Sequence, residues 1–287
     1  RACNSLRKTV RSMPNEENPG QLEVLLDSML SLLADGDTEE AKLISEEILN
    51  RSRSGPDRDH LIEARVRLER ALIGLVPTDN IGSELRWCVD RLNAISRGSS
   101  LHGLALLNLA TWHANRGELM MSLATHSEIS LNNGHPLDIK SLSRIEVGRI
   151  LSTMGDYAPA KRHLWSARSG FIESEMVPEA VAASLEWLDL ALDKIDENSP
   201  TMSALLENAR PREGPGNTQN PSNPSDITDV VEYLFPLLCN DLSGHSRIDL
   251  GLIMEASEKL DRPIWKNALR AREEEIQDPR VLEELQS

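Results

Sequence analysis

The chain has 287 residues, of which 39% are hydrophobic, 27% are charged and only 3% are aromatic. That balance is ordinary for a globular protein whose core consists of Leu, Ile, Val and Ala rather than aromatic rings. The formal net charge of −15 disfavours general affinity for nucleic-acid backbone and for anionic membranes. No apolar run approaches the roughly 18 residues of a membrane span. The three cysteines lie far apart without metal or disulfide spacing, so we expect a reducing, cytoplasmic setting.

The first residues predict a short amphipathic helix followed by a loop. Ala2, Leu6 and Val10 form one apolar stripe within residues 2–13, with basic side chains on the opposite side. We interpret residues 1–20 as the end of a truncated helical repeat. A basic membrane anchor is the alternative, disfavoured because the stripe is short and lacks Trp or Phe.

Three helix pairs are predicted next, each with apolar residues three or four positions apart. The first pair covers residues 25–49 and turns at the sequence ADGD. The second joins helices 61–73 and 81–95 through a loop at 75–80, and the third turns at Gly117. Because one pair cannot bury its own apolar face, neighbouring pairs must stack on one another.

The clearest pair covers residues 141–171 and turns at Gly155. Gly155 can adopt the left-handed conformation that ends a helix, and Asp156 can serve as the N-cap of the next one. Gly148 and Ala160 are small at positions where two helices must approach closely. The pattern therefore predicts an antiparallel helix pair with a short connection.

This pair resembles a tetratricopeptide repeat, whose signature combines W-x2-L-G-x2-Y with A-x3-F. The matching positions are Arg144, Val147, Gly148 and Leu151 in the first part and Ala160 and Leu164 in the second. Gly117 and Gly155 are 155 − 117 = 38 residues apart, which suits longer variants of the basic unit of roughly 34 residues. The resemblance implies an all-α fold, a right-handed α-α superhelix (solenoid) of antiparallel helix pairs. We place it over residues 21–209, with helices at 178–195 and 201–209 as its fifth pair.

The remaining chain predicts a linker and a C-terminal helical segment. Residues 210–225 consist mainly of Pro, Gly, Asn and Ser, so we expect a disordered linker or long loop. Residues 226–287 are predicted to be helical, beginning with a helix that Asp226 caps and in which Pro236 either causes a kink or lies in the last turns. We interpret this segment as a further repeat with a polar cap.

The resemblance also implies that the first helix of each pair lines a concave groove. The candidate groove residues are Arg67, Arg70, Leu107, Asn108, Thr111 and Arg149. Arginines there would suit an acidic peptide or a carboxylate, whereas apolar and small positions would suit an amphipathic helix. The alternative is that the arginines only pair with acids such as Glu63 and Glu69. The family's carboxylate clamp does not carry over, because Leu142 and Glu146 stand where positive charge is needed.

No sequence motif assigns a chemical step. Phosphate-binding, dinucleotide-binding, zinc-protease and serine-hydrolase motifs are absent from the sequence. His113 and His126 could meet inside one helix pair, but a metal site would need further ligands at supporting intervals. We therefore expect no catalytic residue, no metal and no cofactor.

The sequence favours a protein–protein interaction scaffold or adaptor that binds a peptide or helix in a concave groove, without catalysis. The alternative is a regulatory or sensor repeat module of a multidomain signalling or transcription-regulating protein, similar to the helical repeats of maltose-regulator-type activators. An enzyme on a helical scaffold is a third possibility, which would need convergent acids or histidines in a deep pocket.

Overall fold

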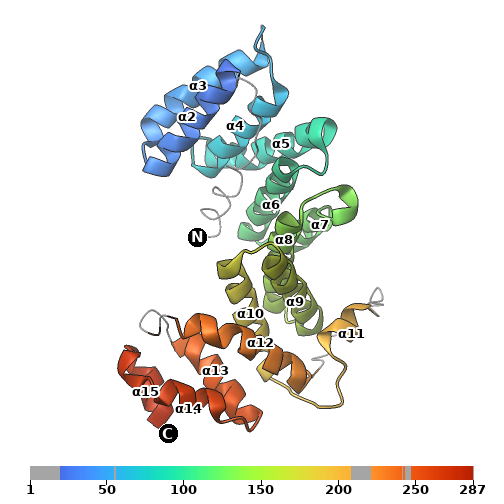
Figure 1. The fold of residues 1–287 in the computed structure, drawn as a ribbon. Helices are drawn as coiled ribbons and strands as arrows, with labels where there is room; N and C mark the ends of the chain where they lie inside the picture. The colour runs from blue at the N-terminus through green and yellow to red at the C-terminus, as the bar shows by residue number, and fades with distance from the viewer. Residues whose placement is uncertain (1–19, 55, 208–220, 241, 243–246, 287) are drawn as a thin grey trace. The chain divides into compact units, whose positions relative to one another are not determined.

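A computed structural model describes residues 20–54, 56–207, 221–240, 242 and 247–286 of the chain (Figure 1). In these ranges the helices are joined by turns and loops, and the one β interaction is an isolated parallel bridge between Ile195 and Ser222. The all-α class predicted from the sequence is therefore confirmed. The predicted helix at residues 2–13 and most of the predicted linker lie outside the described residues.

The chain divides into two compact units, and each is described by itself. Unit 1 ends at Lys140 and unit 2 begins at Ser141, within one helix. The elements of unit 1 are α2 (Gln21–Asp35), α3 (Thr38–Arg53), α4 (His60–Leu72), η1 (Thr78–Asn80), α5 (Ile81–Ser96), α6 (Ser100–Asn115), α7 (Leu119–Ser127), η2 (Leu131–Asn133) and the start of α8 (Leu137–Thr153). From α2 to α7, each α-helix packs against the next one along the chain (Figure 1).

Capping residues set the helix boundaries at the start of unit 1. Gly36 takes φ 87° and ends α2, a backbone conformation that favours glycine. The Asp37 carboxylate then accepts a hydrogen bond from the Glu40 amide and begins α3. Between α2, α3 and α4, buried side chains such as Met29, Ile48 and Val66 form an apolar cluster. The turn and the periodicity predicted for this pair are both confirmed.

A buried pair of histidines joins the start of α6, which contains His102, to the segment before α8, which contains His135. His102 and His135 stack with ring centroids 5.1 Å apart, and His102 Nδ1 lies 3.1 Å from His135 Nε2. The Gly98 amide donates to His102 Nδ1, and the Ser130 amide donates to His135 Nδ1. The Ser130 carbonyl also lies 3.2 Å from His135 Nδ1, so the hydrogen-bond roles of the two rings depend on the tautomer of each. Burial, helped by His135 and Arg97, lowers the pKa of His102 to about 4.

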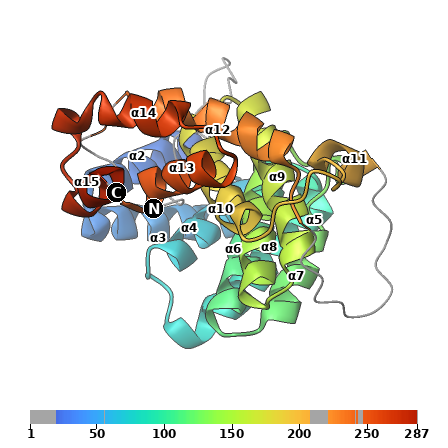
Figure 2. The same ribbon diagram turned by 90° about the horizontal axis from the view of Figure 1, so that it is seen from below.

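Unit 2 is built around α10. It contains the rest of α8, then α9 (Tyr157–Glu173), α10 (Val177–Leu192), α11 (Met202–Glu207), α12 (Pro224–Leu238), α13 (Arg247–Lys259), α14 (Ile264–Arg270), η4 (Glu273–Glu275) and α15 (Pro279–Gln286). The helix α10 packs against α9, α12 and α13, and α13 also contacts α14 and α15. Both views show α12 and α13 beside α10 (Figures 1 and 2). The Trp187 side chain is fully buried on α10 and meets Trp165 edge-on, so these indoles belong to the core.

The α8–α9 turn agrees with the sequence. Gly155 has φ 77° after the end of α8, as predicted for a left-handed helix terminus. A Cβ atom added at Gly148 would lie 2.8 Å from Leu164 Cγ, so only glycine fits without a shift of the neighbouring side chain. The two helices therefore approach closely at the small residue that the sequence singled out.

The predicted cap of α12 is wrong. The helix begins at Pro224, and the side chain of Asn223 accepts from the Ser225 amide. Asp226 lies in the first turn instead, where its carboxylate accepts from the Met202 amide. The sequence Asn-Pro-Ser-Asp offers more than one capping residue, and Pro fits the first helical position best because it has no N–H to satisfy.

A buried lysine fastens the chain just before α12. Lys161 Nζ on α9 donates to Ser222 Oγ at 2.9 Å, and both side chains are buried. Burial lowers the pKa of Lys161 to about 8. Ser222 belongs to the predicted linker, of which the structure describes only residues 221–225. This end of the segment is thus packed against the helices of unit 2.

Candidate binding pocket of unit 1

Unit 1 contains a pocket of about 430 Å³ between α3, α4 and the loop that leads into α5. Its charged lining residues are Glu46, Arg53, Arg67, Arg70 and Glu84. Its apolar lining residues are Leu49, Leu75, Val76 and Pro77, and the amides of Asn50 and Asn80 complete it. A volume of this size is at the lower end of ligand pockets, which run from roughly 300 to 1,000 Å³.

The helix α4 supplies two of the charged residues that line the pocket, Arg67 and Arg70. Asp59 caps it by accepting from the Leu61 and Ile62 amides, which fixes where the helix starts. Glu63, Arg67 and Arg70 then lie four and three residues apart, so they share one face of the helix. Apolar residues on the other face, such as Val66, anchor α4 in the core.

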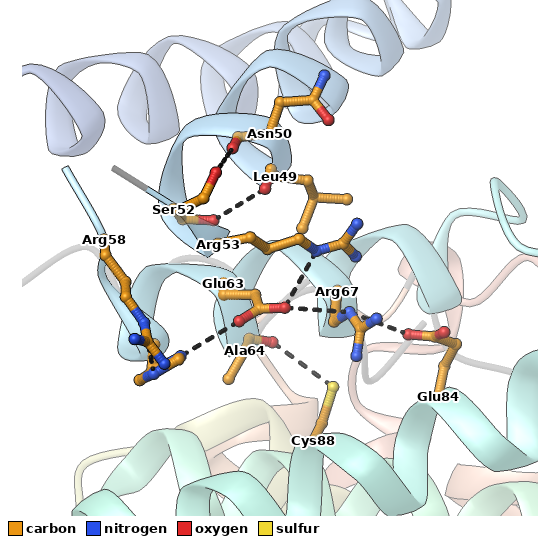
Figure 3. A network of polar contacts seen from close by, with 12 residues as sticks. Leu49, Asn50, Ser52, Arg53, Arg58, Glu63, Ala64, Arg67, Glu84 and Cys88 are labelled. Carbon is orange, nitrogen blue, oxygen red and sulfur yellow. Dashed lines mark hydrogen bonds and ion pairs between the residues drawn. The ribbon is translucent and has the colours of Figure 1, made fainter. Parts of the chain in front are cut away.

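Glu63 is the centre of a charge network (Figure 3). Its side chain is 7% exposed, and Arg53 Nε lies 3.1 Å from Oε1. His60 Nδ1 lies 3.3 Å from Oε2, and Arg67 Nε lies 3.7 Å from Oε1. A buried carboxylate is tolerated when cations and donors surround it, which is the arrangement here.

The Arg67 guanidinium interacts with three side chains: Glu63, Glu84 and Trp87. Besides Glu63, its Nε lies 3.5 Å from Glu84 Oε2 on α5. Its guanidinium lies 3.9 Å from the ring centroid of Trp87, which is within the range of a cation–π contact. Figure 3 shows Arg67 between Glu63 and Glu84, with Cys88 next to the α4 backbone. Burial, together with the charge of Glu84, raises the pKa of Cys88 to about 12, so this thiol stays protonated at neutral pH.

Arg70 differs from its two neighbours in the pocket. Its Nη1 donates to the hydroxyl of Ser45 on α3, and no ion pair joins it to a carboxylate among the described residues. Ser45 is fully buried and in turn donates to the Lys42 carbonyl at 2.6 Å. Because an arginine keeps its charge in proteins, the pocket contains a half-buried cation that is positioned by a neutral group.

The structure places the predicted site residues in different surroundings. Arg67 and Arg70 share the pocket. On α6, Leu107 is buried, the Asn108 amide donates to the Leu104 carbonyl, and the Thr111 hydroxyl donates to the Leu107 carbonyl. The polar groups of Asn108 and Thr111 thus bond to their own helix.

Arg149, the remaining candidate, belongs to unit 2. Its Nε lies 3.0 Å from each carboxylate oxygen of Glu186, and it also pairs with Glu146. The alternative of internal pairing, raised from the sequence, therefore describes Arg149. It also describes Arg65, whose Nε lies 3.0 Å from Glu69 Oε1, and Arg67, which pairs with Glu63 and Glu84. It does not describe Arg70.

Sequence reasoning missed the wall of the pocket. Arg53 lies in the last turn of α3, and Leu75, Val76 and Pro77 belong to a loop that carries no helical period. The signal that points to them is the length of that connection: residues 73–80 separate α4 from α5 and include a proline, whereas only residues 36 and 37 separate α2 from α3.

A second pocket, of about 450 Å³, lies in unit 2 between α10, α13 and α15. Its charged lining residues are Glu186, Asp189, Glu255, Arg280 and Glu284. Glu186 is bound by Arg149, and Glu255 lies 2.7 Å from Lys259 Nζ. Burial, together with Asp193 and Glu255, raises the pKa of Asp189.

Within the described ranges, no group of three or more His, Cys, Asp or Glu side chains is arranged to hold a metal ion. No described helix is both long and apolar enough to cross a membrane. The sequence matches no protein-family model and no curated protein. Any statement about function therefore rests on the geometry of the pockets and on the repeat pattern.

Proposed function

We propose that the chain is a helical-repeat protein of the tetratricopeptide type that binds another protein or peptide and catalyses no reaction. The consecutive pairs α2/α3, α4/α5 and α6/α7 support this proposal, since repeats of this family consist of such pairs. The right-handed superhelix and the cytoplasmic location belong to the same proposal. The free thiols of Cys88 and Cys239 favour a reducing compartment.

The observation that carries the proposal is the unit 1 pocket with Arg70. A pocket that combines an apolar wall with an arginine lacking a carboxylate partner is suited to a partner segment that brings an acidic group. Interfaces are enriched in arginine for this reason, and a central contact of this kind dominates many of them. The described residues that line the pocket include no cysteine, serine or threonine, and burial raises the pKa of the neighbouring Cys88 thiol on α5 to about 12.

The test is affinity capture with the full 287-residue chain, comparing the wild type with Arg70→Glu. We expect a specific partner to be lost in this variant. Arg86→Glu is the matched control. Arg86 is exposed on α5 and does not line the pocket, and this substitution changes the charge by the same amount as Arg70→Glu. Arg67 is unsuitable for substitution, because it stabilises α4 through Glu63, Glu84 and Trp87. Equal capture by all three proteins would contradict a role for the pocket.

A further inference from the structure

Among the described residues that line the unit 1 pocket, Arg70 is the one cation without a carboxylate partner. Arg53 and Arg67 are already bound to Glu63, and Arg67 also approaches Glu84. The Arg70 guanidinium is half-buried and bonded only to a hydroxyl among the described residues. A partly desolvated charge of this kind is stabilised by an anion more than an exposed one would be, because the medium screens it less.

The Arg70 guanidinium has donors left for a bidentate contact with a carboxylate. Ser45 accepts from Nη1, and a guanidinium has further N–H donors in a fixed planar arrangement. Ser45 cannot move easily, because it is fully buried and donates to the Lys42 carbonyl. The remaining donors therefore have a defined direction, which suits the two parallel oxygens of a carboxylate.

An apolar wall accompanies this cation in the pocket. Leu49 from α3 and Leu75 and Val76 from the loop line the same cavity of about 430 Å³. A ligand that reaches Arg70 would bury methylene groups against these side chains, and each buried methylene contributes about 0.8 kcal/mol. The ligand should therefore carry its charge at the end of a short aliphatic stem.

The charge of the pocket limits the ligand to one negative charge. Glu46 and Glu84 also line the cavity, and Glu63 and Glu84 together provide two negative charges for the two arginines Arg53 and Arg67. A dianionic phosphate would bring a second negative charge beside these acids, in a protein whose formal net charge is −15. One carboxylate matches the one guanidinium that lacks a counter-ion.

We infer that the pocket binds a glutamate side chain of a partner segment, with its carboxylate on Arg70 and its methylenes against Leu49, Leu75 and Val76. This inference rests on the proposed function and names the chemistry of the segment that the partner would offer. Ser45 acts as the positioning residue of Arg70.

The test uses the full chain and observes the arginine Nε–H signals by NMR during peptide titration. The probes are acetyl-Leu-Glu-Leu-amide, the same peptide with Gln, acetyl-Leu-Leu-Leu with a free carboxyl end, and inorganic phosphate. We expect the Glu peptide to shift the Arg70 signal saturably and to bind about tenfold or more tightly than the Gln peptide, since charge-assisted hydrogen bonds are roughly twice as strong as neutral ones.

Variants separate a specific site from a change in fold. Arg70→Gln should abolish the difference between the Glu and Gln peptides, whereas Arg86→Gln should keep it. Ser45→Ala should weaken Glu binding several-fold while leaving the Arg70 charge in place. Circular dichroism and thermal unfolding of each variant establish that it is folded.

Three results would overturn the inference. Equal binding of the Glu and Gln peptides would show an apolar site only. Tighter binding of the free carboxyl end would assign the pocket to a chain terminus, and tighter binding of phosphate would make it a general anion site. If Arg70→Glu still loses the captured partner in any of these cases, the proposed function stands and only the glutamate assignment fails.

Discussion

Two arginines predicted as binding residues, Arg70 in unit 1 and Arg149 in unit 2, have opposite surroundings. Arg149 is bound by both oxygens of Glu186, 37 residues later in the chain. Arg70 instead donates to the hydroxyl of Ser45, 25 residues earlier, and has no carboxylate partner among the described residues. The difference lies in the residue that packs against each arginine: a carboxylate occupies Arg149, whereas a neutral hydroxyl leaves the charge of Arg70 without a counter-ion.

The two pockets extend this contrast. They have similar volumes, about 430 and 450 Å³, yet the lining of one is mixed in charge and that of the other is mainly acidic. The carboxylates that pair with the arginines also differ in burial. The Glu63 side chain, which pairs with the pocket residues Arg53 and Arg67, is 7% exposed, whereas the Glu186 side chain, which lines the second pocket, is 33% exposed. The charge pairing around Glu63 is therefore buried, and that around Glu186 lies nearer to solvent.

The largest expected effect separates these two carboxylates. Glu63→Gln should reduce the free energy of unfolding by about 2–3 kcal/mol, because the partly buried Arg67 loses a counter-ion and the cost of breaking such pairs is large. Glu186→Gln should cost less than about 1 kcal/mol, the usual value for an exposed pair. Urea unfolding followed by circular dichroism measures both. An equal decrease in the free energy of unfolding in the two variants would show that the burial of Glu63 does not make its ion pairs more important for stability than those of Glu186.

The next effect is the response of unit 1 to acid. His102 has its pKa lowered from 6.5 to about 4, so between these values the unfolded chain binds more protons than the folded one. The contribution of His102 to stability is complete above pH 6.5 and is lost as the pH falls towards 4, by an amount on the order of 2 kcal/mol. Burial lowers the pKa of Lys161 in unit 2 from 10.5 to about 8, so this lysine changes the pH dependence of stability between about pH 8 and 10.5 and not in acid.

Denaturant unfolding at a series of pH values from 7 to 4 checks the acid response. The variant His102→Gln keeps an acceptor and a donor at this position but cannot titrate, so its stability should depend less steeply on pH than that of the wild type. An unchanged slope in the variant would show that other groups cause the acid response of the protein.

Much of the fold followed from local patterns, whereas the pocket did not. The helix pair around Gly155 and the close approach at Gly148 were predictable, because helix periodicity and glycine geometry act within a few residues. The partner of Arg70, Ser45, lies 25 residues away, and periodicity identifies a face without identifying what packs against it. Asp226 was misassigned because several residues nearby can cap a helix.

The smallest expected effect concerns Arg149. Its side chain is 41% exposed, so Arg149→Gln should change the free energy of unfolding by less than about 1 kcal/mol at physiological salt. Its guanidinium is already occupied by Glu186 and Glu146, so partner capture should be retained in this variant. Loss of the partner in Arg149→Gln would contradict the comparison between the two arginines. Arg149, although paired with two glutamates, would then contribute to partner binding as Arg70 does. Retention together with loss in Arg70→Glu would show that pairing within the fold, rather than residue type or helix position, decides which arginine binds.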